Sequence, residues 1–365
     1  MYNGAMEWPD WHSKISWQSL NRQYYIPYLT PARNWLFGKR SWLRPLFFLV
    51  TTILILFIGL EIILFALWWN TNTPNQNEVI PFPISVNPDQ KSIVEDPSVD
   101  TFFVNEVSDN ATVIKQTGIK GKLLSLLAGD KWYQNLASVN GRVVVIWPGE
   151  RKEESAHNIG VILGWTKEEE KRFTELVLKD YPDMEEGVLA AGRYQVAKNA
   201  SPEVVAKLVR DRFENEVGVR YTQELEEILP FKEAMIIASL LEREARDFTD
   251  MREISGVIWN RLFIDMKLQL DATLQYIKGS EPNQPWWPIV IPKDKYRESP
   301  FNTYQNTGLP PSPIASPSLE AVLAALNPVI TDCLFYFHDS LGNFYCSKDY
   351  RSHVSKLRQL YGRGR

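Results

Sequence analysis

The feature that most constrains this chain is one long apolar run, from Leu46 to Trp69. At 1.5 Å per residue, a helix over this run would be about 36 Å long, which exceeds the roughly 30 Å hydrocarbon core of a bilayer. A cleaved signal peptide would have a shorter apolar stretch and a small-residue cleavage site, whereas here 45 residues precede the run. The sequence therefore predicts an uncleaved transmembrane helix over residues 46–69.

Charge predicts the orientation of this helix. Segment 1–45 contains six basic residues, whereas segment 70–109 contains one, Lys91, among seven acidic residues. Basic residues favour the cytoplasmic side of a membrane. We therefore expect a single-pass protein of the inner (plasma) membrane, with residues 1–45 as a cytoplasmic arm and the chain after about residue 70 outside the cytoplasm.

Three further segments follow the apolar run. Residues 70–100 are rich in Pro, Asn and acidic residues with little periodicity, which indicates a linker. Residues 101–226 form a predicted accessory region, in which the β-rich run 142–146 meets a turn and a helical pattern. Residues 227–365 are expected to form an α+β domain with two helices and a C-terminal strand pair. The predicted fold class is therefore α+β, behind one transmembrane helix.

Two glutamates lie at the edges of an apolar helix face. Glu242 and Glu244 fall roughly 80° to either side of that face at about 100° per residue. A carboxyl group at such an edge can be partly desolvated, which raises its pKa and lets it keep a proton near neutral pH. Helical spacing alone leaves open whether either glutamate is a general acid or an ordinary surface charge. The apolar face consists of Ala234, Ile237, Ala238, Leu241 and Ala245.

A second helix is predicted shortly after the first. Asp250 and Glu253 resemble a capping pair at its start. Its expected buried face consists of Ile254, Val257, Ile258 and Leu262.

Several sequence blocks then follow in a characteristic order. Together with Ala238–Ala245 and the final Phe344–His353 stretch, they resemble the YceG-like (MltG) family of membrane-anchored endolytic murein transglycosylases. The resemblance covers most of segment 227–365. The intervening blocks are Trp259–Leu262, Met266–Thr273, Ser299–Tyr304, Gly308–Ala315 and Ala324–Pro328.

The resemblance implies a specific reaction. Members of the family cut the β-1,4 bond after N-acetylmuramic acid without water and leave 1,6-anhydro ends. It assigns the acid to Glu242, a choice that helical geometry does not make. Because the substrate's own C6 hydroxyl is the nucleophile, one carboxylate suffices, whereas hydrolytic glycosidases normally need two. The resemblance implies peptidoglycan glycan strands as substrate, no cofactor, and peptidoglycan synthases as candidate partners.

Six polar residues match family motif positions and suit a sugar site. Amides can bind hydroxyl and acetamido groups, and a phenol can cover a sugar face. The same residue types also cap helices and hold turns, so a structural role stays equally open for each. These residues are Asn260, Arg261, Gln269, Asp271, Asn302 and Tyr304.

Two upstream segments depart from the family pattern. Arg142–Glu150 resembles its LysM-like unit, which usually has Pro-Glu-Gly where this chain has Pro148-Gly149-Glu150. A glycan-binding unit and a plain spacer both remain open for this region. At Ala190–Arg193, the family tends to show an aromatic-Pro pair before an acidic-Thr-Tyr sequence.

Composition limits other functions. A net charge of −4 provides no basic field for nucleic acid, and four scattered histidines with two distant cysteines predict no metal site. Cys333 and Cys346 lie on predicted strands around a turn at 339–342. A disulfide and a pair of free thiols are both compatible with that placement.

Three hypotheses of different classes follow. The first is the lytic transglycosylase with Glu242 as acid. The second is a water-using peptidoglycan hydrolase, which would need Glu244 or Asp271 in addition. The third is a non-catalytic glycan-binding scaffold, suggested by the aromatic N-terminal arm and by the departures at Ala190–Arg193.

Overall fold

The computed structural model describes the backbone of residues 43–72, 79–107 and 141–362. The chain divides into two compact units, residues 1–78 and 79–365. In the first unit, helix α2 spans Leu43–Asn72, and its described side chains are mostly apolar and exposed. Among the described residues, no helix is both long enough and apolar enough to cross a membrane.

The predicted anchor and arm are only partly covered by the described residues. Segment 46–69 falls within α2, but side chains are described there only from Phe47 to Ile62. The predicted transmembrane helix therefore stays a prediction. Of the cytoplasmic arm predicted over residues 1–45, residues 1–42 lie outside the described residues.

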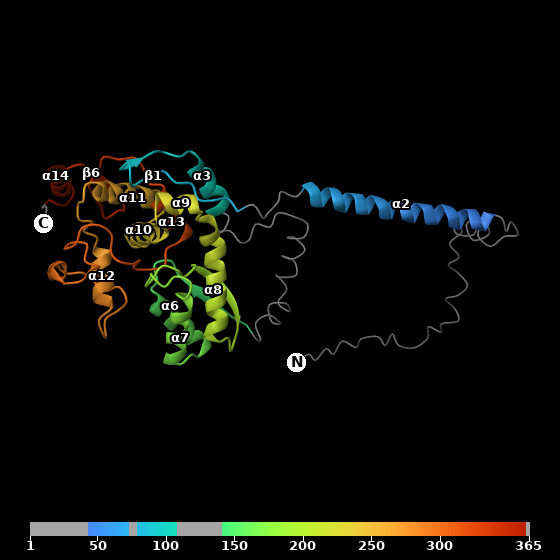
Figure 1. The fold of residues 1–365 in the computed structure, drawn as a ribbon, viewed down its shortest axis with the longest axis horizontal. Helices are drawn as coiled ribbons and strands as arrows, with labels where there is room; N and C mark the ends of the chain where they lie inside the picture. The colour runs from blue at the N-terminus through green and yellow to red at the C-terminus, as the bar shows by residue number, and fades with distance from the viewer. Residues whose placement is uncertain (1–42, 73–78, 108–140, 363–365) are drawn as a thin grey trace, which may run out of the picture. The chain divides into compact units, whose positions relative to one another are not determined.

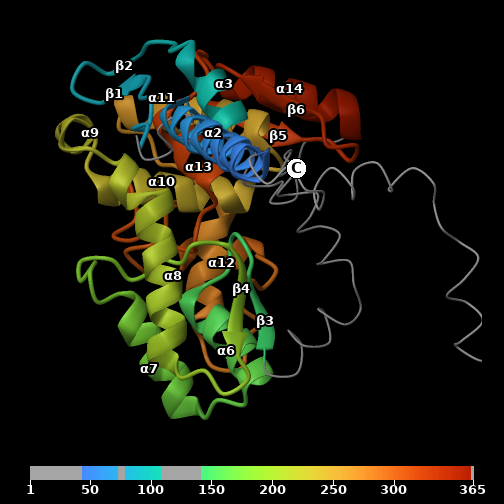
Figure 2. The same ribbon diagram turned by 90° about the vertical axis from the view of Figure 1, so that its right-hand side faces the viewer.

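The second unit has the predicted α+β character (Figure 1). Residues 141–197 form a βααβ arrangement, here called the βααβ part (Figure 2). Its two strands pair antiparallel, with Val144 opposite Tyr194. Helices cover this small sheet and bury a separate apolar cluster that includes Ile146, Phe173 and Val205. The elements are β3 (Gly141–Ile146), α6 (Lys152–Leu163), α7 (Lys167–Val177) and β4 (Gly192–Ala197), followed by α8 (Pro202–Glu216), a 3₁₀ turn (Gly218–Arg220) and α9 (Gln223–Ile228).

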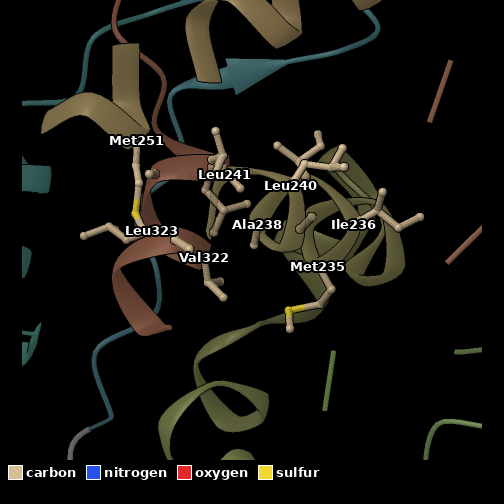
Figure 3. Packing of buried hydrophobic residues seen from close by; sticks show 14 of the residues in the cluster. Met235, Ile236, Ala238, Leu240, Leu241, Met251, Val322 and Leu323 are labelled. Carbon is tan, nitrogen blue, oxygen red and sulfur yellow. The ribbon is translucent and has the colours of Figure 1, made fainter. Parts of the chain in front are cut away.

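The catalytic half predicted from sequence is built around one buried helix, α10 (Phe231–Glu244). The sequence predicts a single apolar face on this helix, but all eight residues from Ala234 to Leu241 are buried. In Figure 3, Ala238 and Leu241 point toward α13, while Ile236 points away from it. A helix that is apolar on all sides belongs in the centre of a core. Its neighbours are α11 (Phe248–Phe263), α12 (Asp271–Gly279) and α13 (Leu319–Leu326).

Helix α11 starts earlier than predicted. Its N-cap is Asp247, whose side chain accepts a hydrogen bond from the backbone N–H of Asp250 at 3.0 Å. Asp250, the predicted cap, instead accepts from the backbone N–H of Arg246 and contacts His338. Of the predicted buried face, Ile254, Val257 and Ile258 are buried, and Leu262 is partly buried against the core.

The predicted linker over residues 70–100 is wrong in its second half. From Val79 onward the chain joins the second unit, and Phe82 and Val86 are buried in the main core. Asn327 holds this segment by donating to the carbonyl oxygen of Pro83 at 2.8 Å and accepting from the hydroxyl of Ser85 at 2.8 Å. The segment contains β1 (Val86–Asn87), β2 (Ser92–Ile93), α3 (Ser98–Phe102) and a π-helical turn (Phe103–Val107).

The predicted C-terminal hairpin is confirmed. Strands β5 (Phe335–His338) and β6 (Phe344–Ser347) pair antiparallel, and helix α14 (Tyr350–Tyr361) follows them (Figure 2). Cys333 and Cys346 form a disulfide across Cα atoms 5.7 Å apart, which settles the alternative that the sequence left open. A 3₁₀ segment, Pro292–Tyr296, lies between α12 and α13.

A helical glycine provides a test of this packing. A Cβ on Gly256 of α11 would lie 2.5 Å from the backbone oxygen of Val329. Alanine is normally better than glycine in a helix by about 1 kcal/mol, yet here the clash is with backbone that cannot move easily. We expect Gly256→Ala to lower the free energy of unfolding by about 1–3 kcal/mol, measured by thermal unfolding.

The matched control is Gly160→Ala in α6. There the nearest atom to an added Cβ is the end of the flexible Glu170 side chain, at 2.8 Å. A Gly256→Ala protein at least as stable as the wild type would contradict the close packing of α11 on the 329 segment.

Candidate active site

Glu242 lies in the last turn of α10 and is held by the start of α13. Its Oε2 accepts hydrogen bonds from the backbone N–H of Ser318 at 2.9 Å and from the Ser318 hydroxyl at 2.6 Å. Ser318 is also the N-cap of α13, because its Oγ accepts from the backbone N–H of Ala321. The carboxylate therefore joins the C-terminal end of one helix to the N-terminal end of another.

Burial sets the electrostatics of this carboxyl group. Desolvation raises the pKa of Glu242 above its ordinary value, and the two hydrogen bonds from Ser318 offset only part of that rise. The C-terminal end of a helix disfavours negative charge, so α10 acts in the same direction. A raised pKa keeps a carboxyl group protonated closer to neutral pH, as a general acid requires.

A turn from the βααβ part lies directly against the acid. Gly149 has φ +79°, and a Cβ there would be 3.2 Å from a terminal guanidinium nitrogen of Arg243 and 3.6 Å from Cγ of Glu242. The Gly149 N–H donates to the Ser316 oxygen at 2.8 Å, and the Ser316 N–H donates to the Glu150 oxygen at 2.9 Å. The two halves of the second unit therefore meet at Glu242.

Stacked cations and aromatic rings extend this junction. The Arg243 guanidinium carbon lies 3.8 Å from the centre of the Trp287 ring, and that of Arg151 lies 4.0 Å from the Tyr276 ring. The Trp287 indole donates to Glu154 of α6 at 3.1 Å. These contacts join α6 and α10 to the segment around α12, so the turn against Glu242 is well anchored.

A buried carboxyl group lies at the start of α6. Glu186 is almost fully buried and accepts from the backbone N–H of Lys152 at 2.9 Å. Burial raises the pKa of Glu186 to about 8, even though the Lys152 ammonium group lies 3.4 Å away. These contacts are all to Lys152, so Glu186 holds the start of α6.

Glu244 is tied into the fold through both oxygens. Oε1 accepts from the backbone N–H of Ala272 at 3.3 Å, and Oε2 accepts from the hydroxyl of Tyr336 at 3.0 Å. Burial raises the pKa of Glu244. The carboxylate thus links α10 to α12 and to the C-terminal hairpin, which is a structural use of the side chain.

Three of the six predicted sugar-binding residues direct their donors to backbone oxygens. The Asn260 amide donates to the Thr331 oxygen at 2.8 Å. Arg261 Nε donates to the Leu334 oxygen at 2.6 Å. Asn302 is fully buried, and its amide donates to backbone oxygens of the 3₁₀ segment and the residue after it. In these contacts all three hold loops in place.

The other three predicted residues gather at one accessible edge. The Tyr304 hydroxyl donates to Oδ1 of Asp271 at 2.7 Å. Gln269, which is exposed and has φ +52°, donates its backbone N–H to the Thr303 oxygen. Asp271 is also exposed and starts α12, one residue before the Ala272 N–H that binds Glu244. These side chains are placed where a ligand could reach them.

A cavity of about 430 Å³ opens beside Ser318. Its wall includes Trp147 and Pro148 from the turn against Glu242, and the segment Ala190–Arg193 that departs from the family pattern. Trp147 is 62% exposed. Sequence reasoning did not find Ser318: its position before an apolar helical run signals an N-cap, but its contact with Glu242 spans 76 residues.

Metal chemistry has no evident site in the described ranges. There, no group of three or more His, Cys, Asp or Glu side chains is arranged to hold a metal ion.

Known proteins resemble this chain over different lengths. A family model described as the YceG-like family matches residues 112–359. A Bacillus subtilis protein named endolytic murein transglycosylase is 38% identical over 127 residues, which is 35% of this chain and 34% of that protein. A Streptococcus pneumoniae R6 protein of the same name is 29% identical over 169 residues, 46% of this chain and 31% of that protein. The chain thus matches about a third of the length of these curated relatives.

A solved structure extends the comparison to the fold. The crystal structure of a yceG-like protein from Listeria monocytogenes superposes with a TM-score of 0.51 at 25% sequence identity. The match covers 76% of this chain and 98% of that one.

The Glu244 contacts predict a pH-dependent stability effect. Tyr336→Phe removes the donor to Glu244 Oε2 and should cost about 1–2 kcal/mol of unfolding free energy when Glu244 is charged. The folded-state pKa of Glu244 is raised, so the carboxyl is neutral below that pKa and charged above it. The Tyr336 hydroxyl stabilises the charged form of Glu244 more than the neutral form. Its loss should therefore lower the free energy of unfolding more at about pH 8 than at about pH 5.

Thermal unfolding of the variant at both pH values tests this expectation. Tyr345→Phe is the control, because its hydroxyl donates to Asp339, a carboxylate in the exposed turn of the same hairpin. An equal loss for Tyr336→Phe at both pH values would contradict the assignment.

Proposed function

This chain belongs to the YceG-like family, and we therefore propose that it is an endolytic peptidoglycan lytic transglycosylase with Glu242 as its acid. The observation that carries the proposal is the state of Glu242. One of its oxygens is fixed by Ser318, burial raises its pKa, and a cavity opens beside that clamp. The names of the curated relatives support the same reaction.

The proposed reaction uses one carboxyl group twice. Glu242 donates its proton to the glycosidic oxygen between N-acetylmuramic acid and N-acetylglucosamine as an oxocarbenium-like centre forms. The resulting carboxylate accepts the proton of the C6 hydroxyl on the muramic acid as that oxygen attacks the anomeric carbon. The bond to the leaving sugar breaks, a 1,6-anhydro ring forms, and Glu242 is protonated again.

The cavity beside Ser318 is the proposed place for the glycan. Sugar rings commonly bind in clefts with apolar walls and a few polar groups, and the exposed Trp147 ring provides such a wall. Gln269, Asp271 and Tyr304 provide polar groups on the accessible edge near Glu244. Asn260, Arg261 and Asn302 would shape the site through the loops that they hold.

The contacts of Glu244 and Asp271 favour the transglycosylase over a water-using hydrolase. A hydrolase needs a second carboxylate free to activate water or attack the sugar. Both oxygens of Glu244 accept hydrogen bonds within the fold, and Asp271 accepts from Tyr304. A reaction that needs only Glu242 fits this arrangement better.

The setting of the reaction is also part of the proposal. The apolar run 46–69 and the charge difference across it support a single anchor in the inner (plasma) membrane, with the N-terminus in the cytoplasm. The anchored enzyme would then act outside the cytoplasm, close to newly made strands and to the synthases that make them. The βααβ part would serve as a LysM-like glycan-binding unit, as the contact of its Gly149 turn with Glu242 favours.

Product analysis tests the function. We expect full-length protein in detergent to release fragments with 1,6-anhydro-muramic acid ends from purified peptidoglycan, identified by mass spectrometry. Glu242→Gln should lower the rate by at least about a thousandfold, because it removes the proton donor. Glu244→Gln is the matched control on the same helix and should keep the anhydro product, at a lower stability.

Other outcomes would change the assignment. Reducing muramic acid ends would indicate a hydrolase. Absence of cleavage by folded wild-type protein that still binds glycan would indicate a scaffold.

A further inference from the structure

Ser318 makes two contacts with Glu242 and a third with the start of α13. Its backbone N–H and its hydroxyl both donate to Oε2 of Glu242, and its Oγ accepts from the Ala321 N–H at the start of α13. Within the described part of the chain, no hydrogen bond joins the other oxygen of Glu242, Oε1, to any residue. Ser318 also lines the 430 Å³ cavity.

We propose that Ser318 is a positioning residue that fixes Glu242 with Oε2 as the acceptor and leaves Oε1 as the oxygen that carries and delivers the proton. This inference rests on the proposed transglycosylase function and adds a residue to it.

Hydrogen-bond chemistry leads to this assignment. A backbone N–H can only donate, so the oxygen that it contacts must accept. Oε2 already accepts two hydrogen bonds, and a proton placed there would oppose both donors. The proton of neutral Glu242 therefore resides on Oε1. Because a carboxylate is stabilised by such donors, Ser318 also favours the ionised state that must accept the C6 proton in the second half of the reaction.

The location of Ser318 strengthens the effect. As the N-cap it stands at the positive end of the α13 dipole, which favours a nearby negative charge. Two charged groups act in opposite directions on the pKa of Glu242: Glu320 on α13 raises it, and Arg243 on its own helix lowers it. Glu150, on the adjoining turn, is held by the side chains of Ser155 and Asn158. The donors that contact Glu242 directly are thus both from Ser318.

The test removes the hydroxyl alone. Ser318→Gly keeps the backbone N–H and, as an N-cap, glycine costs only a few tenths of a kcal/mol. Loss of a donor to the charged form raises the pKa of Glu242, and the enzyme acts with Glu242 protonated. The alkaline limb of the pH–rate profile should therefore move up by about one pH unit. The kcat on the acidic plateau should fall about tenfold with little change in KM, because the proton donor is less well oriented.

Two companion variants separate positioning from helix capping. Ser318→Thr retains a hydroxyl, so its pH–rate profile should have the wild-type alkaline limb. Thr222→Gly removes the side-chain cap of α9, where Thr222 accepts from the Leu225 N–H, and should leave the pH profile unchanged. If the Ser318→Gly enzyme keeps the wild-type kcat and the wild-type alkaline limb of the pH–rate profile, Ser318 acts only as a helix cap and the proposal is wrong.

A second measurement needs no turnover. Carbodiimides react with protonated carboxyl groups, so coupling of an amine to Glu242 in the full-length protein, followed by mass spectrometry of the peptide, reports its protonation against pH. We expect the labelling of Glu242 to persist about one pH unit higher in Ser318→Gly than in the wild type. Identical labelling curves would refute the proposal even if the wild type proved inactive, whereas shifted curves in an inactive protein would refute only the proposed function.

Discussion

The packing of α10 against α13 is the contact on which the rest of the catalytic half depends. Leu241 is fully buried, as are Val322 and Leu323 of α13, and Figure 3 shows Leu241 beside α13. This apolar contact fixes where α10 ends relative to where α13 begins. Since Glu242 follows Leu241 directly, the same contact brings its carboxylate to Ser318, the N-cap of α13. The position of Glu242 is thus a consequence of core packing.

That position places Glu242 between two helix ends of opposite polarity. The C-terminal end of α10 and the loss of water favour the neutral carboxyl group. The N-terminal end of α13, acting through the N–H and hydroxyl of Ser318, favours the charged one. In the proposed reaction Glu242 first gives up a proton and then takes one back, so neither form should be strongly preferred. The opposed helix ends act on the carboxyl group in opposite directions, as that proposal requires.

Local sequence patterns predicted most helices, turns and strands. They did not predict contacts between segments that are far apart in the sequence. The helix around Glu242, the turn after Ile146 and the C-terminal hairpin follow from periodicity and turn residues. The start of α11 was misplaced because Asp247 and Asp250 are both plausible caps, and the choice depends on the contact between Asp250 and His338. The segment after Val79 looked like a linker because its few apolar residues pack on helices that are distant in sequence. Such contacts leave no periodic hydrophobic pattern in the segment itself.

The same distinction explains the candidate site. A family motif shows that a residue is placed in a recognisable block, but it does not separate an amide that binds sugar from one that holds a loop, as Asn260 does. Ser318 is visible in the sequence as a cap, and only the tertiary fold shows that it holds Glu242.

Glu244 looks like a candidate acid in the sequence, but the tertiary fold shows that it holds structure together. The disulfide ties Cys333 to Cys346 at the base of the hairpin, the hairpin presents Tyr336, and the Tyr336 hydroxyl engages Glu244. Two glutamates that helical spacing could not tell apart are therefore distinguished by their partners. Both oxygens of Glu244 accept hydrogen bonds within the fold, whereas among the described residues only Oε2 of Glu242 does.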